Sequence, residues 1–326
     1  MAAFTSEEII QATGARLLKP AASVSFSDVC TDTRAIAKGS LFVAFKGTSF
    51  TGHEFVDKAL AAGAAGAVVS EVRPEYEGLT APIFVAADTL KAYQDLARFH
   101  RRRFAIPVVA VTGSVGKTST RNMIATVLSE KYRVLQTEKN FNNEIGLPKT
   151  LLQLTPDHEA CVVEMGMRGL GQIAELAAIG EPTIGVVTNV GKSHIELLGS
   201  QENIAKAKAE LVQALDEKGT AVLNGDDPFV RPMTALCKGK TVLYGTDDQA
   251  AVRADHIVCD QQGVRFHCSG AGQSFDVSVP VIGGHNVYNA LAAIAVGQLT
   301  GLSAAEIQRG LASYPGMAMR QELLHI

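Results

Sequence analysis

The chain lacks paired cysteines, an excess of basic residues and any long apolar run. Its 326 residues carry a formal net charge of −3, so no broad basic field favours nucleic acid as a partner. No apolar run reaches membrane-spanning length and no signal peptide precedes the first polar residues, so we expect no membrane insertion. The five cysteines are scattered without a CxxC pair, which indicates neither a disulfide framework nor a zinc site and favours the reducing cytoplasm.

The length and the hydrophobic content of 47% are sufficient for about two domains, each with its own core. The sequence divides near residue 105, after a helix whose arginine-rich end is a plausible connector to a new apolar segment. We expect a small α/β domain over residues 1–104, in which short strands alternate with turns and helices. Its strands are predicted at 24–26, 41–45, 66–69 and 83–85, and its helices at 5–14, 55–62 and 92–103.

Residues 105–313 alternate between strand and helix patterns in the manner of a doubly wound α/β domain. This alternation predicts a central, mostly parallel sheet with helices on both faces, and ligands then bind beyond the carboxyl ends of the strands. A small β excursion is expected over 252–279, before a helix over 286–299. The other strands are predicted at 108–111, 134–136, 160–164, 184–188, 220–223 and 241–244, and the other helices at 118–130, 147–153, 171–178 and 202–216.

One segment combines a buried strand, a glycine turn and the start of a helix. The apolar run Val108–Val111 leads into Thr112-Gly-Ser-Val-Gly-Lys-Thr118, after which a helix-like sequence begins. Backbone N–H groups and the helix dipole at such a turn bind phosphate, a lysine adds charge and a hydroxyl can ligate Mg²⁺. Because position 111 is valine, the segment fits the shorter pattern T-G-x-x-G-K-[ST]. It predicts a P-loop-type phosphate site.

Polar residues follow later strands of the same domain. The asparagines at 140, 142 and 143 can cap a helix or hydrogen-bond a polar ligand. Glu164 ends an apolar strand. A carboxylate at this position can ligate Mg²⁺ on nucleotide phosphates, and it can equally be a solvent-exposed strand end. His194 follows the next strand, although a lone histidine is more often structural than a ligand. The segment 204–210 is compatible with an ordinary charged helix face.

The order and spacing of these motifs resemble the Mur ligase family, and within it the ligases that add D-alanyl-D-alanine. The likeness extends over nearly the whole chain. In the first domain it rests on Thr31-Asp-Thr-Arg34, Gly39-Ser-Leu-Phe-Val-Ala-Phe-Lys-Gly47 and Gly52-His-Glu-Phe55. In the second it rests on the phosphate loop, Lys139-Asn-Phe-Asn-Asn-Glu-Ile-Gly-Leu-Pro148, Glu164-Met-Gly-Met167, Thr188-Asn-Val-Gly191, His194-Ile-Glu196, residues 199–210, Asn224-Gly-Asp-Asp227 and Gly284-His-Asn-Val-Tyr-Asn-Ala-Leu-Ala-Ala293.

The resemblance implies an ATP-dependent amide ligase of peptidoglycan precursor synthesis. ATP would phosphorylate the terminal carboxylate of UDP-N-acetylmuramoyl-tripeptide, and the amine of D-alanyl-D-alanine would attack the acyl phosphate. The implied cofactors are ATP, Mg²⁺ at two sites, and carbon dioxide bound as a lysine carbamate. We expect the protein to be monomeric.

The same resemblance assigns roles to individual residues. Phosphate and adenine binding would fall to Gly113, Ser114, Val115, Gly116, Lys117, Thr118, Ser119, Asn286 and Asn289. Catalysis would fall to Lys117, Glu164, His194 and Lys208, and the metal ligands would be Thr118, Glu164, His194 and the carbamate of Lys208. The UDP-sugar substrate would contact Thr31, Asp32, Thr33, Arg34, Lys46, Gly47, His53, Asn140, Asn142 and Asn143. Lys206 points elsewhere on its helix and is the weaker carbamate candidate, while Asn286 could equally cap the helix that begins there.

One departure from the family pattern concerns the end of the chain. Family members carry a third, C-terminal domain, and residues 314–326 look like its connector and first strand. We therefore expect a shortened form that ligates little by itself. Two alternatives stay open: another amide ligase of the family, such as a third-residue-adding ligase or a folylpolyglutamate synthase, or a non-catalytic module that binds the UDP-sugar or ATP. A switch GTPase is disfavoured because no Asn-Lys-x-Asp motif occurs.

Overall fold

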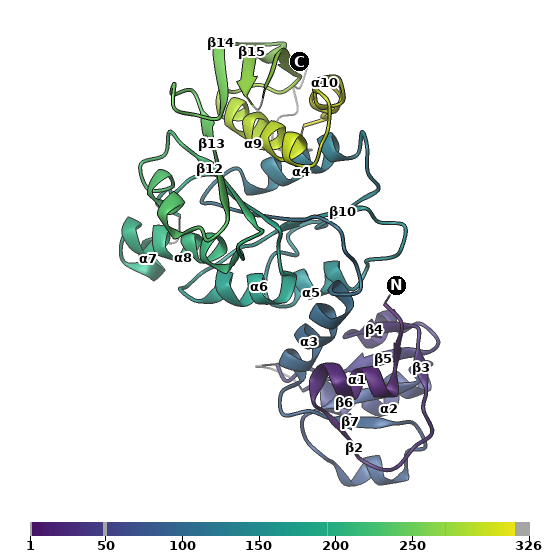
Figure 1. Ribbon diagram of the computed structural model, residues 1–326. Helices are drawn as coiled ribbons and strands as arrows, with labels where there is room; N and C mark the ends of the chain where they lie inside the picture. Colours follow the sequence, from purple (N-terminus) through teal and green to yellow (C-terminus); the bar gives the residue numbers. More distant parts are fainter. Residues whose placement is uncertain (1, 48–50, 194, 271, 317–326) are drawn as a thin grey trace, which may run out of the picture. The chain divides into compact units, whose positions relative to one another are not determined.

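The computed structural model describes residues 2–47, 51–193, 195–270 and 272–316, and these form two compact units (Figure 1). The first unit comprises residues 1–105 and 148–155, and the second comprises 106–147 and 156–326. Each unit has its own sheet and its own buried apolar cluster. No helix among the described residues is both long and apolar enough to span a bilayer.

The first unit is a small α/β fold built on a five-stranded sheet in the order β2-β7-β6-β5-β4, in which only β2 is antiparallel to its neighbour. A separate antiparallel pair, β1 with β3, lies outside that sheet. The helix predicted at 5–14 is confirmed as α1, which begins with a capping box formed by Thr5 and Glu8. The elements are β1 Phe4–Thr5, α1 Ser6–Thr13, β2 Arg16–Leu17, β3 Ser25–Phe26, β4 Asp28–Cys30, η1 Thr33–Ala35, β5 Ser40–Val43, η2 Gly52–Phe55, α2 Val56–Ala61, β6 Gly66–Val69, η3 Pro74–Gly78, β7 Ile83–Val85 and α3 Thr89–Arg101.

The second unit contains a nine-stranded sheet in the order β16-β15-β14-β13-β12-β11-β8-β10-β9. The strands β8 to β14 pair in parallel, whereas β15 is antiparallel to both of its neighbours, β14 and β16. The elements are β8 Val108–Thr112, α4 Lys117–Leu128, β9 Val134–Gln136, α5 Gly146–Leu151, β10 Ala160–Glu164, α6 Gln172–Gly180, β11 Ile184–Val187, α7 Ile195–Leu198, α8 Gln201–Ala214, β12 Thr220–Asn224, η4 Arg231–Leu236, β13 Lys240–Gly245, β14 Val252–Asp260, β15 Gly263–Gly270, β16 Gln273–Val279, α9 His285–Leu299 and α10 Ala304–Ala312.

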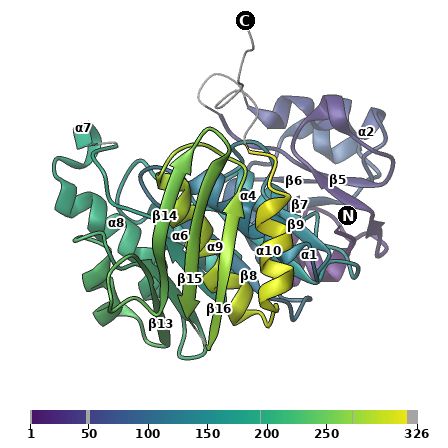
Figure 2. The same cartoon turned by 90° about the horizontal axis from the view of Figure 1, so that it is seen from above.

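Helices cover both faces of this sheet, as the doubly wound prediction requires. Helices α4, α9 and α10 pack together on one face, and α6 packs with α8 on the other (Figures 1 and 2). The apolar core of the unit lies mainly between the sheet and the first of these layers, where α9 is buried along most of its length. The α/β fold class predicted from the sequence is thus confirmed.

The strand order places several strand ends at one point. The chain leaves β8, forms β9 beyond β10, and later returns to form β11 on the other side of β8. Register brings Glu164 of β10 opposite Val111 of β8, and Val187 of β11 opposite Thr112. The segments that follow β8, β10 and β11 therefore meet at the carboxyl edge of the sheet, which is the reversal point where open α/β sheets bind ligands.

The β excursion predicted at 252–279 is confirmed as β14, β15 and β16, and β14 also pairs with β13, so that the excursion extends the main sheet. Helix α10 was not predicted, although Ser303 and Glu306 form a capping box at its start. It approaches α4 closely, since a Cβ on Gly310 would lie 2.7 Å from the Cα of Val127.

Glu210 of α8 caps the N-terminus of α6, the helix that follows the loop after β10. The Glu210 carboxylate accepts hydrogen bonds from the backbone N–H groups of Gly171 (2.6 Å) and Ala174 (3.0 Å) at the start of α6. Because an anion there compensates both unpaired amides and the helix dipole, we expect Glu210→Ala to lower the free energy of unfolding by about 1–2 kcal/mol. Urea unfolding would measure the loss. The exposed carboxylate of Glu217 provides the control, and equal losses for both alanine variants would contradict the capping role.

Candidate functional site

The predicted phosphate loop forms the connection between β8 and α4. Strand β8 ends at Thr112, α4 begins at Lys117, and Gly116 is the helix N-cap with a φ of +80°, which glycine adopts without strain. Gly116 contributes no side-chain cap. The positive end of the α4 dipole is therefore presented at the loop without a capping side chain, which is the arrangement that binds phosphate.

The segment after β11 holds this loop in place. The Asn189 side chain accepts a hydrogen bond from the Val115 N–H (3.0 Å) and donates one to the Val115 carbonyl (2.9 Å), and the Thr188 hydroxyl donates to the same carbonyl (2.9 Å). Gly113 packs so closely that a Cβ on it would lie 1.9 Å from Thr188 Oγ1. The loop is thus preorganised by contacts with the neighbouring strand end, which fixes the direction of its amides.

Lys117 lies over the loop. Its Nζ donates hydrogen bonds to the carbonyl oxygens of Gly113 (2.9 Å) and Ser114 (3.3 Å). The ammonium group is held above the amides that would cradle a phosphate, where it adds positive charge to the same small region. The Lys117 ammonium group therefore lies directly against the glycine turn, as the sequence pattern predicts.

Glu164 is almost fully buried and is held from several directions. Its Oε2 accepts a hydrogen bond from the Thr118 hydroxyl (2.9 Å), and its Oε1 accepts one from the Asn142 amide (2.8 Å). Arg121 Nη1 lies 3.5 Å from Oε2, and the two side chains of this ion pair are 5% and 3% exposed. Thr118 and Glu164, two of the metal ligands that the resemblance implies, therefore lie side by side.

Lys208 is the buried lysine of α8. Its side chain is buried, whereas Lys206 on the same helix is exposed, so the helical phase agrees with the choice of Lys208 over Lys206. Burial, together with the nearby Lys117 ammonium, lowers the pKa of the Lys208 amine to about 7. A large share of its population is therefore the neutral amine near neutral pH.

The other expected metal ligand, His194, lies outside the described residues. Over the described part of the chain, no group of three or more His, Cys, Asp and Glu side chains is arranged to hold a metal ion. A hydroxyl and one carboxylate at a phosphate loop are nonetheless the oxygen donors that Mg²⁺ takes when phosphates and water supply its remaining ligands. The donor set at Thr118 and Glu164 fits that use.

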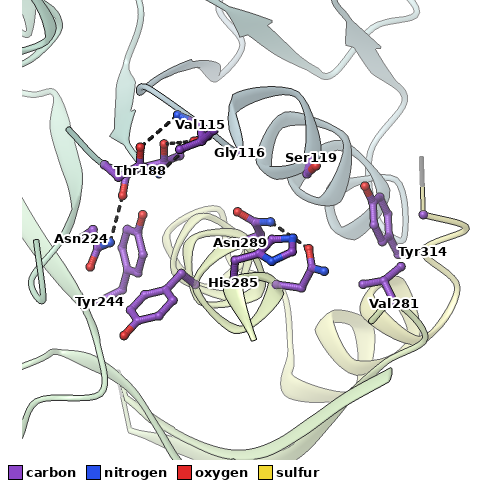
Figure 3. Close-up of a pocket in the computed structure, with 14 residues that line it drawn as sticks. Val115, Gly116, Ser119, Thr188, Asn224, Tyr244, Val281, His285, Asn289 and Tyr314 are labelled. Atoms are coloured by element: carbon purple, nitrogen blue, oxygen red, sulfur yellow. Dashed lines mark hydrogen bonds between the residues drawn. The ribbon is translucent and has the colours of Figure 1, made fainter. Parts of the chain in front are cut away.

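A cavity of about 510 Å³ adjoins the phosphate loop and the first turn of α9 (Figure 3). Asn289 accepts a hydrogen bond from Thr120 on α4 (2.9 Å) and donates one to Asn286 (2.9 Å). Asn286 donates to the carbonyl of Ile282 (3.0 Å) and lies inside α9, whose N-cap is Gly284, so its side chain does not cap the helix. The cavity is lined by Val115, Gly116, Ser119, Thr188, Asn189, Asn224, Tyr244, Val281, His285, Asn286, Tyr288, Asn289, Tyr314 and Gly316.

A second cavity, of about 420 Å³, is also lined by residues of the phosphate loop. It brings Lys117 and Lys208 together with the three asparagines of the 140–143 segment and with the loop after β10. Gln172 shapes that loop, because its side-chain oxygen accepts hydrogen bonds from the N–H groups of Arg168 (2.6 Å) and Gly169 (3.2 Å). Its lining is more polar than that of the first cavity and comprises Gly113, Lys117, Asn140, Asn142, Asn143, Glu144, Gly166, Met167, Arg168, Gln172, Glu175, Leu176 and Lys208.

The candidate substrate residues of the first unit lie in two turns. Asp32 caps η1, and its carboxylate pairs with the exposed Arg34 guanidinium (2.7 Å), which holds the pKa of Asp32 at about 2. Thr33 belongs to η1 and Thr31 precedes it. Lys46 and Gly47 are exposed, and Lys46 forms an isolated bridge with Thr51.

His53 is buried in the first unit rather than presented at its surface. Its Nδ1 lies 2.8 Å from the Thr51 hydroxyl, and its Nε2 accepts a hydrogen bond from the Ser70 N–H (2.9 Å). The acceptor role of Nε2 and the burial of the ring favour the neutral form, and burial lowers the pKa of His53. Both ring nitrogens are thus engaged within the unit, where they tie η2 to the end of β6.

Two residues that hold the site together were not singled out from the sequence. Arg121 stands within α4, where an arginine in a helix is ordinarily exposed, and no local signal indicates its burial beside Glu164. Asn189 belongs to the segment 188–191 that follows β11, and its amide makes both hydrogen bonds to Val115. Its position directly after a β-branched strand is the signal that could have revealed it.

Comparisons with known proteins agree on one family. The family profile "Mur ligase middle domain" matches residues 111–297, and "Mur ligase family, catalytic domain" matches residues 25–101. A UDP-N-acetylmuramoyl-tripeptide–D-alanyl-D-alanine ligase of Synechocystis is 46% identical over 292 residues, which are 88% of this chain and 61% of that protein. The chain therefore spans about three fifths of the length of that curated relative.

Solved structures lead to the same group. The MurF structure from Acinetobacter baumannii superposes with a TM-score of 0.91 at 29% identity, covering 100% of this chain and 72% of that one. The MurF ligase from Thermotoga maritima, solved in complex with ADP, has a TM-score of 0.80 at 28% identity, covering 89% of this chain and 66% of that one.

Proposed function

The chain belongs to the Mur ligase family, and we propose that it forms the sugar-nucleotide and ATP-binding part of an enzyme that joins D-alanyl-D-alanine to UDP-N-acetylmuramoyl-tripeptide. The observation that carries this proposal is the meeting of three features at one edge of a parallel sheet. These are a glycine turn with its lysine, the Thr118 hydroxyl bonded to the buried Glu164 carboxylate, and a nucleotide-sized cavity beside the turn.

ATP would bind in the second unit. The amides of residues 113–119 and Lys117 would hold the β- and γ-phosphates, and the cavity near Asn286 and Asn289 would take the adenosine moiety. The substrate carboxylate oxygen would attack the γ-phosphorus, the bond to the β-phosphate oxygen would break, and ADP would leave. Most of the work of such a site is positioning and charge neutralisation, because phosphoryl transfer needs little else from the protein.

Divalent cations would sit beside the phosphates. Thr118 and Glu164 would hold one Mg²⁺, whose role is to neutralise charge on the phosphate oxygens, and His194 would help to hold a second. Lys208 would become a ligand as a carbamate, formed when its neutral amine attacks carbon dioxide and loses a proton. The lowered pKa of Lys208 supports this role, because only the neutral amine reacts. A bicarbonate-dependent ¹³C carbamate resonance that is lost in Lys208→Met would test it.

The sugar nucleotide would bind chiefly through residues 1–104. The turns at Thr31–Arg34 and Lys46–Gly47 carry exposed polar groups, and Arg34 offers a fixed guanidinium suited to phosphate. Residues 105–313 are the proposed ATP-binding domain, and we expect a monomeric cytoplasmic protein that needs neither nucleic acid nor a membrane.

Chemical trapping of the acyl phosphate tests the function. Incubation with Mg-ATP, UDP-N-acetylmuramoyl-tripeptide and hydroxylamine should yield a hydroxamate on the peptide carboxylate, with ADP formed in equal amount. ATP cleavage without hydroxamate would indicate a plain ATPase, and binding of both ligands without any cleavage would indicate a non-catalytic module. Either result would contradict the proposal.

A further inference from the structure

Asn142 belongs to the segment assigned to substrate binding, yet its side chain is bound to another site residue. Its Nδ2 donates a hydrogen bond to Glu164 Oε1 at 2.8 Å. The opposite oxygen, Oε2, faces the Thr118 hydroxyl at 2.9 Å and the Arg121 guanidinium at 3.5 Å. The two carboxylate oxygens therefore have different partners: Oε1 is anchored by the asparagine, and Oε2 faces the start of α4.

The backbone around Asn142 is anchored to the same strand end. The Asn142 carbonyl accepts a hydrogen bond from the Gly166 N–H (2.9 Å), two residues beyond Glu164. Gly166 also packs against the asparagine side chain, since a Cβ on Gly166 would lie 3.1 Å from the amide carbon and oxygen of Asn142. Asn142 thus contacts the Glu164 segment through both its main chain and its side chain, and the amide has little freedom to turn away.

We propose that Asn142 is a positioning residue that orients Glu164 and thereby sets the affinity of the site for a divalent cation. The inference rests on the proposed function. A carboxylate with one oxygen tethered cannot rotate about its Cγ–Cδ bond without breaking the tether, so Oε2 stays directed at Thr118. A cation held by Thr118 and Glu164 would displace the hydrogen bond that the Thr118 hydroxyl donates to Glu164 Oε2. The hydrogen bond from Asn142 to Oε1 would be kept.

The alternative role of Asn142 is direct contact with the sugar-nucleotide substrate. That role requires a donor hydrogen or the amide oxygen to be turned toward the cavity, and the amide is partly committed to Glu164. The two roles predict different effects of removing the amide: a positioning role weakens cation binding, and a contact role weakens substrate binding. Groups that orient metal ligands change metal affinity by about 10–100-fold when removed.

Manganese binding separates the two roles, because Mn²⁺ substitutes for Mg²⁺ and its free form is measured directly by electron paramagnetic resonance. In the presence of saturating ADP, we expect Asn142→Ala to raise the Kd for Mn²⁺ by about 10–100-fold. The Kd for UDP-N-acetylmuramoyl-tripeptide, measured without metal, should change less than about twofold. Asn140→Ala is the matched comparison, since this exposed asparagine lines the same cavity two residues earlier. It should leave the Kd for Mn²⁺ unchanged.

A second variant perturbs the same contact from the other side. Gly166→Ala should displace the Asn142 amide by a few tenths of an ångström and weaken Mn²⁺ binding in the same direction. Equal Mn²⁺ affinity of the wild type and both variants, with their thermal unfolding unchanged, would overturn the positioning role while leaving the proposed function intact. A wild-type chain that binds no Mn²⁺ in the presence of ADP would overturn the proposed function and the inference together.

Discussion

Replacement of Lys117 by alanine is expected to lower the affinity for Mg-ATP by at least about 30-fold. The ammonium group lies over the glycine turn, 2.9 Å from the Gly113 carbonyl, where a phosphate would meet both it and the α4 dipole. Loss of one partner from a close, partly buried charge pair costs about 2–5 kcal/mol, which corresponds to roughly 30-fold or more in affinity. Isothermal titration calorimetry with Mg-ATP measures the change.

A lysine outside the site provides the control for that experiment. Lys218 is exposed and lies beyond the end of α8, so Lys218→Ala should bind Mg-ATP as the wild type does. Equal affinities of the wild type and Lys117→Ala would show that the glycine turn does not hold the phosphates. The assignment of the 113–119 loop would then be wrong, whatever the fold of the unit.

In buffer free of carbon dioxide, Lys208→Met is expected to stabilise the protein below pH 7 and to lose that advantage as the pH rises. The pKa of Lys208 is lowered from 10.5 to about 7 in the folded state, so the folded protein holds a costly buried charge below pH 7. Between pH 7 and 10.5 the unfolded chain binds more protons at this residue, so the stability of the wild type increases with pH relative to the variant. The difference amounts to about 5 kcal/mol at most.

Chemical unfolding between pH 6 and 9.5 checks this pH dependence. Lys206→Met is the matched control, because Lys206 is exposed on the same helix and its replacement should leave the pH profile parallel to that of the wild type. If the stability difference between wild type and Lys208→Met were constant over this pH range, Lys208 would titrate as an ordinary lysine. The physical basis for its reaction with carbon dioxide near neutral pH would then be absent.

The parts of the site that follow from local sequence were predicted, and the contacts between distant segments were not. The strand, glycine turn and helix at 108–128 lie consecutively in the chain, so their pattern could be read directly. Thr118 and Glu164 were expected as metal ligands only because the resemblance implies it, and the structure places their side chains in contact. In contrast, nothing near Asn142 indicates that its partner is a carboxylate 22 residues later.

Burial explains the remaining differences. Arg121 and His53 carry polar side chains that are usually exposed, and only the tertiary structure shows that Glu164 and Ser70 supply their partners. The strands at 252–279 alternate as any antiparallel excursion would, and their junction with the main sheet depends on the pairing of β14 with β13. Local periodicity carries no information on which edge a strand joins.

Hydrogen exchange of the chain with and without each ligand tests the central claim most directly, because it reports the place of binding rather than its strength. Mg-ATP should protect the backbone amides of residues 113–120 and those around the start of α9. UDP-N-acetylmuramoyl-tripeptide should protect chiefly the turns at Thr31–Arg34 and Lys46–Gly47. Protection of residues 1–104 by Mg-ATP with none at the phosphate loop, or protection of that loop alone by the sugar nucleotide, would contradict the proposed division of binding between the two units.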